Sequence, residues 1–180
     1  VDGRCTADTF EATRDGDLLA LATCTSFFGE LEIKDEVSSL APLANLVTID
    51  GDLKIEPDVL ANLEGLSALT TVSGELKIEG VASLEGATVL SSVGELVVEK
   101  SGVMTLSGLA ALATVQRGIE LKENDFLIDV ALPAITSIGG RITVEDNPFL
   151  PICRVHQLAD SVTPSPLVRD EGGNGIGTCD

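Results

Sequence analysis

The chain has 180 residues, of which 44% are hydrophobic, and its formal net charge is -18. The length is typical of one domain with a sizeable core, and the acidic excess excludes binding to nucleic-acid phosphates or to anionic membranes through basic residues. No apolar run is long enough to span a bilayer. The charge indicates either a solvated, solubilising surface or an acidic face for a cationic or metal-bridged partner.

The N-terminal part, residues 1–28, predicts a cap. Residues 14–23 (RDGDLLALAT) have the pattern of a short amphipathic helix that would cover the first repeat. The four cysteines permit three pairings, of which we favour the most local, Cys5–Cys24 with Cys153–Cys179. Two bridges indicate an oxidising compartment and therefore export.

A repeated strand motif follows in residues 29–150. Each copy places two apolar residues two positions apart, and the copies are GELEI (29–33), GDLKI (51–55), GELKI (74–78), GELVV (94–98), RGIEL (117–121) and GRITV (140–144). Their first apolar residues, Leu31, Leu53, Leu76, Leu96, Ile119 and Ile142, are spaced by 22, 23, 20, 23 and 23 positions. This period fits one coil of a solenoid, so we predict an all-β fold in which parallel strands stack coil upon coil.

The segments between the strands carry apolar residues at every third position, as in Leu60, Leu63, Leu66 and Leu69. This spacing allows short helices or 3₁₀ turns, but the segments are brief and contain Gly, Pro and β-branched residues. We therefore favour a wrapped backbone that turns every third residue inward. A glycine precedes several strands and predicts a tight corner there; these glycines are Gly29, Gly51, Gly74 and Gly94.

The C-terminal part, residues 151–180, predicts a second cap. Prolines interrupt the repeat here, and a short helix is expected near residues 155–160, beside a loop closed by Cys153–Cys179. We interpret residues 1–180 as a single domain. No signal peptide is visible at Val1, so we expect a secreted or cell-surface protein whose signal peptide or anchor has been removed. No N-x-S/T sequon occurs, which favours a bacterial source.

The ordered set of motifs CTSFFGELEI, LSALTTVSGELKIEG, ITSIGGRITVEDNPFLPIC and GGNGIGTC resembles the receptor L-domain family. The likeness covers essentially the whole chain and is greatest to the bacterial, myxobacterial-type exported members. It implies a short right-handed parallel β-helix with capping helices and an extracellular recognition role. The sequence departs from the family's common pattern in two ways. Its outer face is rich in charged residues, and we expect it to expose no aromatic residues.

The outward residues of the strands form the candidate binding surface. They would line up in rows across the coils, and the candidates are Glu32, Lys54, Glu75, Lys77, Glu79, Glu95, Glu99 and Glu120. Either these rows are a solvated face of weak ion pairs, or they are a flat acidic docking surface, with Ca²⁺ as a bridging ion. We predict no dedicated metal site, because no D-x-D-x-D-G loop is present and His156 is the only histidine.

Binding or adhesion is the function that these patterns favour. The chain has no Trp or Tyr platform for sugar cleavage and no G-x-S-x-G or P-loop motif, so we expect no enzyme and no cofactor. Regular T-x-T ladders for ice binding are also absent. We expect a monomer that recognises a protein or glycan ligand; the alternative is a structural or assembly component of a bacterial envelope layer.

Overall fold

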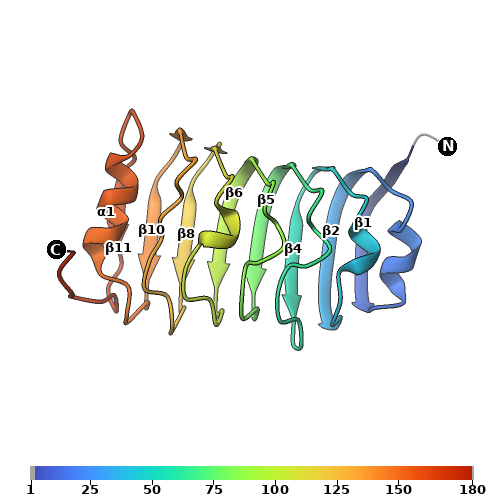
Figure 1. The fold of residues 1–180 in the computed structure, drawn as a ribbon, viewed down its shortest axis with the longest axis horizontal. Coiled ribbons are helices and arrows are strands. Elements are labelled where there is room, and N and C mark those ends of the chain that lie inside the picture. Colours follow the sequence, from blue (N-terminus) through green and yellow to red (C-terminus); the bar gives the residue numbers. More distant parts are fainter. Residues whose placement is uncertain (1–2, 180) are drawn as a thin grey trace.

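The computed structural model describes residues 3–179, which form a row of strands with one α-helix at the C-terminal end (Figure 1). The all-β prediction is therefore confirmed. The described elements are β1 (Arg4–Arg14), η1 (Asp17–Leu21), β2 (Ser26–Glu36), η2 (Ala41–Leu43), β3 (Thr48–Asp50), β4 (Leu53–Pro57), β5 (Thr71–Glu79), β6 (Ser92–Glu99), η3 (Ser107–Leu109), β7 (Thr114–Val115), β8 (Ile119–Lys122), β9 (Ser137–Ile138), β10 (Ile142–Glu145), α1 (Ile152–Asp160) and β11 (Val168–Asp170), where η marks a 3₁₀ helix.

Every strand pairing in the described chain is parallel, and the main path runs β1-β2-β3-β5-β6-β8-β10-β11. The strands follow one another in chain order, with connecting segments between them (Figure 1). The register joins the equivalent residues of the six predicted motifs, since Leu53 lies beside Leu31 and Leu76, and Ile119 lies beside Leu96. The predicted period is thus the number of residues along the chain that separates paired residues in adjacent strands.

The inward residues form one continuous core that extends from Ala12 to Val162. The first apolar residue of each predicted strand motif is at most 1% exposed. The Leu60–Leu69 ladder is buried as well, at 4% exposure or less. Each repeat thus buries its apolar side chains against the repeats beside it, which is why a single repeat would not be stable alone.

The N-terminal part differs from the prediction. Residues 14–23 do not form an amphipathic α-helix; they contain the 3₁₀ helix η1, and residues 4–14, expected within the cap, form the 11-residue strand β1. β1 pairs in parallel with β2, with Phe10 beside Leu31. Its sequence, RCTADTFEATR, has few large apolar residues. The strand lies at the end of the sheet, where it has the core on one side only.

The connecting segments show both of the alternatives left open by the sequence. The segment with Leu60 to Leu69 has turns only, as expected, whereas η2 and η3 are short 3₁₀ helices in two other segments. At the C-terminal end the predicted helix is present as α1, three residues longer at its start than expected.

Gly51 shows why a glycine stands at the corner before a strand. Its φ is +148°, a conformation that side chains disfavour, and a Cβ built on it would overlap the carbonyl oxygen of Gly29 in the preceding repeat. Gly74 and Gly94 continue the same column, each against the backbone of the glycine before it. The glycines thus let successive corners stack in direct backbone contact.

Both disulfides have the favoured pairing. Cys5 and Cys24 are 5.8 Å apart at Cα, and Cys153 and Cys179 are 6.1 Å apart. The first bridge joins β1 to the segment that precedes β2, and the second ties the C-terminal tail to α1. Among the described residues, none of the helices has the length and apolar content needed to cross a membrane.

Candidate binding surfaces

The eight predicted binding residues lie together on the outward side of the sheet, here named the strand face. Sheet pairing places Lys54 beside both Glu32 and Lys77, and Glu75 beside Glu95. Glu79 lies beside Glu99 in the adjacent strand. These residues lie side by side because outward positions repeat with the strand period, and their role in binding stays a prediction.

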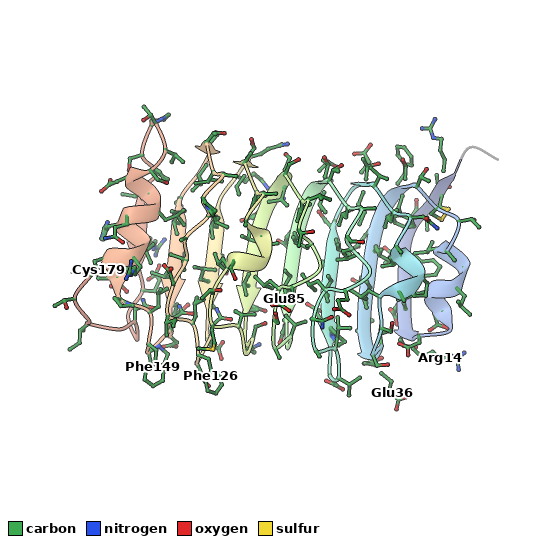
Figure 2. The ribbon with its side chains drawn as sticks, in the orientation of Figure 1. Arg14, Glu36, Glu85, Phe126, Phe149 and Cys179 are labelled. Carbon is green, nitrogen blue, oxygen red and sulfur yellow. A yellow bond between two sulfur atoms is a disulfide. The ribbon has the colours of Figure 1, made fainter. Side chains whose placement is uncertain are left out.

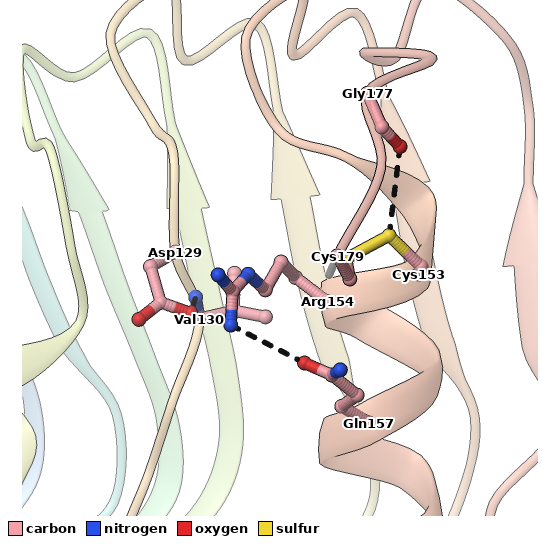
Figure 3. The surroundings of a disulfide bond; sticks show 7 residues. All are labelled: Asp129, Val130, Cys153, Arg154, Gln157, Gly177 and Cys179. Atoms are coloured by element: carbon pink, nitrogen blue, oxygen red, sulfur yellow. Dashed lines mark hydrogen bonds between the residues drawn. A yellow bond between two sulfur atoms is a disulfide. The ribbon is translucent and has the colours of Figure 1, made fainter.

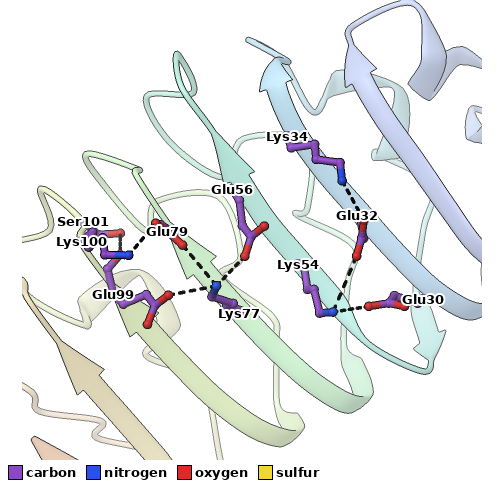
Figure 4. A network of polar contacts seen from close by, with 10 residues as sticks. All are labelled: Glu30, Glu32, Lys34, Lys54, Glu56, Lys77, Glu79, Glu99, Lys100 and Ser101. Atoms are coloured by element: carbon purple, nitrogen blue, oxygen red, sulfur yellow. Dashed lines mark hydrogen bonds and ion pairs between the residues drawn. The ribbon is translucent and has the colours of Figure 1, made fainter.

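Lys77 is the centre of an ion-pair network on this face (Figure 4). Its Nζ lies 2.5 Å from Glu56, 2.9 Å from Glu99 and 3.2 Å from Glu79. Burial alone would lower the pKa of Lys77, but hydrogen bonds to these carboxylates outweigh it and raise the pKa. The ammonium group of Lys77 thus offsets carboxylate charges from three adjacent strands.

A second group continues the network toward the N-terminus. Lys54 pairs with Glu30 and Glu32, and Lys34 pairs with Glu32 at 3.0 Å (Figure 4). In the network as a whole, six carboxylates pair with four ammonium groups: those of Glu11, Glu30, Glu32, Glu56, Glu79 and Glu99 with those of Lys34, Lys54, Lys77 and Lys100. At the centre of the strand face these charges are therefore already paired with one another and are less available to a partner.

One row of the strand face keeps an excess of negative charge. It contains Asp52, Glu75 and Glu95, of which Glu95 pairs with Arg117 at 3.2 Å. The pKa of Glu75 is raised, first by burial and then by the charges of Glu95 and Asp52. This row holds like charges close together, and it does not form a metal site: the described residues include no group of three His, Cys, Asp or Glu that could hold an ion.

A buried asparagine ladder, which the sequence analysis did not single out, lies at the turns that follow the last strands. Asn124 Nδ2 donates to Val98 O at 2.9 Å and to Asn147 Oδ1 at 3.0 Å. Asn147 Nδ2 donates in turn to Leu121 O at 2.9 Å and to Asn174 Oδ1 at 3.0 Å. Each amide thus bonds to both neighbouring repeats and fixes their turns relative to one another.

The ladder places two phenylalanines at one edge of the molecule. Asn124–Leu127 and Asn147–Leu150 are equivalent turns, each closed by a hydrogen bond from the leucine N–H to the asparagine carbonyl. Asn and Leu are buried in both turns, so the residue before each leucine points outward: Phe126 is 61% exposed and Phe149 is 64% exposed. The expectation that no aromatic residue is exposed is therefore wrong.

Phe126 and Phe149 lie next to each other and project from the lower edge in Figure 2. Asn174 is followed two residues later by Ile176, which is fully exposed. We name Phe126 and Phe149 the apolar edge. The signal in the sequence was the recurrence of N-x-F-L at residues 124 and 147, one repeat apart.

An acidic hollow of about 420 Å³ adjoins the apolar edge. Phe126 forms part of its wall together with the carboxylates of Glu123, Asp125 and Asp146. Within the described chain, these three carboxylates form no ion pair, whereas Lys100, also in the wall, is paired with Glu79 at 3.3 Å. The hollow thus has three carboxylates outside any ion pair and one lysine in its wall, so it keeps an excess of negative charge.

A second hollow, of about 310 Å³, lies between α1 and residues 129–135. Its floor is apolar, and Asp129, Arg154 and Gln157 stand at its side. Figure 3 shows Arg154 beside Asp129, with Arg154 Nη1 3.4 Å from Gln157 Oε1, close to the Cys153–Cys179 bridge. His156 is on α1 and is exposed, away from the strand face.

Comparisons with known protein families, with curated proteins and with solved structures found no match for this chain.

Proposed function

We propose that this protein is a non-catalytic recognition or adhesion module that works outside the cell or at its surface and binds a protein or glycan partner. The observation that carries the proposal is the apolar edge. The chain has only five phenylalanines and no Trp or Tyr, yet two of the phenylalanines are exposed at equivalent places in adjacent repeats. Exposed aromatic residues at a fixed spacing are costly in water and are common where proteins bind partners.

The rigidity of the edge supports the same function. Both rings stand on turns that are held by the buried asparagine ladder, so little conformational freedom is lost when a partner binds. The location outside the cell is supported by the two disulfides, which persist in oxidising compartments. As the finer architecture, we propose a right-handed β-solenoid of the receptor L-domain kind; the parallel, in-register pairing of successive repeats supports it.

A structural or assembly role is the second candidate, and the end strand β1 favours it. In the strand pairings of the described residues, β1 has β2 as its only neighbour, so its other edge is open. An open edge can pair with another chain. However, β1 carries Arg4, Asp8, Glu11 and Arg14, and charges of this kind discourage edge-to-edge pairing. We therefore prefer recognition.

A binding screen of the oxidised protein against protein and glycan arrays, with and without Ca²⁺, tests the proposal. The wild type is compared with Phe126→Ser/Phe149→Ser and with a strand-face variant, Glu75→Lys/Lys77→Glu/Glu79→Lys. We expect a saturable hit that the first variant loses and the second retains. Loss only in the strand-face variant would move the site there, and no hit, together with concentration-dependent association in sedimentation, would favour assembly.

A further inference from the structure

We propose that the partner of the apolar edge is a basic segment of another protein, whose arginine side chains stack on Phe126 and Phe149 while the carboxylates of the acidic hollow bind their charge. This inference rests on the proposed recognition function and names the chemistry of its ligand. The hollow and the edge share Phe126, so that an aromatic face and acidic oxygens border the same space.

The charges around the edge favour a cationic group. Glu123, Asp125 and Asp146 have no ion-pair partner among the described residues, in contrast to Glu56, Glu79 and Glu99 around Lys77. The whole chain carries a net charge of -18, so a basic partner would also be attracted from a distance. An aromatic face attracts a cation through its ring quadrupole, and arginine is the cation that most often occupies such positions.

The same pairing already occurs elsewhere on the molecule. The guanidinium carbon of Arg4 lies 4.7 Å from the centre of the Phe28 ring. Phe126 and Phe149 have no such cation above them in the described chain, although they are more exposed than Phe28. The apolar edge therefore offers two similar rings that are open to an arginine from outside.

Other occupants fit less well. A second copy of this chain would bring the same carboxylates against one another, because a symmetric contact presents identical surfaces. An acidic glycan would be repelled by the hollow, and a neutral glycan would leave its three carboxylates without charge partners. A basic segment satisfies the two rings and the carboxylates together.

The test is a titration of the ¹⁵N-labelled, oxidised protein with hexa-arginine amide, followed by backbone amide shifts. Hexalysine, hexaglutamate and cellohexaose are titrated in parallel. We expect hexa-arginine to shift residues 123–128, 146–150 and 172–177, and to bind more tightly than hexalysine because only the planar guanidinium stacks on a ring. Phe126→Ser/Phe149→Ser should weaken hexa-arginine binding about fivefold to tenfold, the loss expected for two exposed ring–cation contacts.

Two matched controls separate the edge from general acidity. Asp125→Asn/Asp146→Asn should weaken binding, whereas Glu64→Gln/Glu85→Gln, which removes the same charge from exposed positions between other strands, should not. Val59→Ser/Val89→Ser removes two exposed apolar side chains elsewhere and should also leave binding unchanged.

Shifts spread over the strand face, or equal binding by the phenylalanine variant, would overturn the inference. So would edge shifts caused by cellohexaose and not by hexa-arginine. An array hit that needs Phe126 and Phe149 but is not basic would leave the recognition function standing and refute only the basic partner. If no binding depends on these rings, the basic partner is refuted, and the recognition function stands only if the strand-face variant loses an array hit.

Discussion

Asn124 Nδ2 donates a hydrogen bond to Asn147 Oδ1 at 3.0 Å, and both side chains are fully buried. The two residues occupy the same place in adjacent repeats, and each is followed two positions later by an exposed phenylalanine. This bond therefore links the stability of the stack to the placement of Phe126 and Phe149. Buried amides of this kind are favourable only when all of their donors and acceptors are satisfied, as they are here among the described residues.

Replacing Asn147 should destabilise the protein strongly. Asn147→Ala leaves the backbone N–H of Asn124 and the carbonyl of Leu121 without their buried partners. We expect the free energy of unfolding to fall by about 3 kcal/mol, since each orphaned group costs about 1–3 kcal/mol. Urea denaturation measures the change. Asn45→Ala, which removes one exposed hydrogen bond to Ala22, should cost less than about 1 kcal/mol; equal losses would mean that the ladder has no special role.

The corner glycines give a second prediction. Gly51→Ala places a Cβ on the carbonyl oxygen of Gly29 at a positive φ, so the two repeats must move apart. We expect a loss of more than about 2 kcal/mol in the free energy of unfolding. Gly16→Ala is the matched control, because Gly16 has helical backbone angles and nothing within 4 Å of its Cβ position. Similar stability of the two variants would show that the stacked corners are not in close contact.

Lys77 should stabilise the strand face in a salt-dependent way. Lys77→Met leaves the carboxylates of Glu56, Glu79 and Glu99 facing one another without their shared cation. We expect a loss of about 1 kcal/mol at low salt that shrinks in about 1 M NaCl, where the Debye length is about 3 Å. Lys100→Met removes one exposed pair and should cost less than half as much. A loss that does not depend on salt would point to packing instead.

Glu75 should destabilise the folded protein, by an amount that depends on pH. Because its pKa is raised in the folded protein, the folded state binds its proton more tightly than the unfolded state, so the wild type loses stability as the pH rises through the acid range up to that raised pKa. Glu75→Gln does not titrate and should be more stable than the wild type at pH 7, by about 0.5 kcal/mol. The difference should vanish near pH 4. Thermal unfolding across this range measures it, and a gain at pH 4 alone would contradict the raised pKa.

Much of the fold was readable from the sequence because each repeat has the same environment. The inward residues Leu31 to Ile142 recur at nearly constant spacing, and the observed register follows that spacing. The strand β1 was missed because an end strand has a core on one side only and needs fewer large apolar residues, as in Thr6, Ala7 and Thr9. The helix expected in residues 14–23 was wrong because Leu18 and Leu21 belong to the segment that connects β1 to β2 and not to a separate cap.

The candidate surfaces were only partly predictable. The strand period placed Glu75, Lys77 and Glu79 on one face, but whether lysines neutralise the glutamates depends on side-chain reach across strands, which the sequence does not show. Phe126 and Phe149 are hydrophobic residues of a kind that is most often buried in the core, so their residue type does not predict exposure. Their exposure follows from the spacing of three between the buried Asn and the buried Leu of each turn, which leaves the two residues between them outside the core.

The central claim is that Phe126 and Phe149 serve binding and not folding. The most direct test measures, on the double variant Phe126→Ser/Phe149→Ser, both the free energy of unfolding in urea and the affinity for the partner found in the array screen. Because both rings are mostly exposed, the account predicts a free energy of unfolding within about 0.5 kcal/mol of the wild type, with an affinity lower by about tenfold or more. Unchanged affinity, or a loss of several kcal/mol in stability, would contradict it.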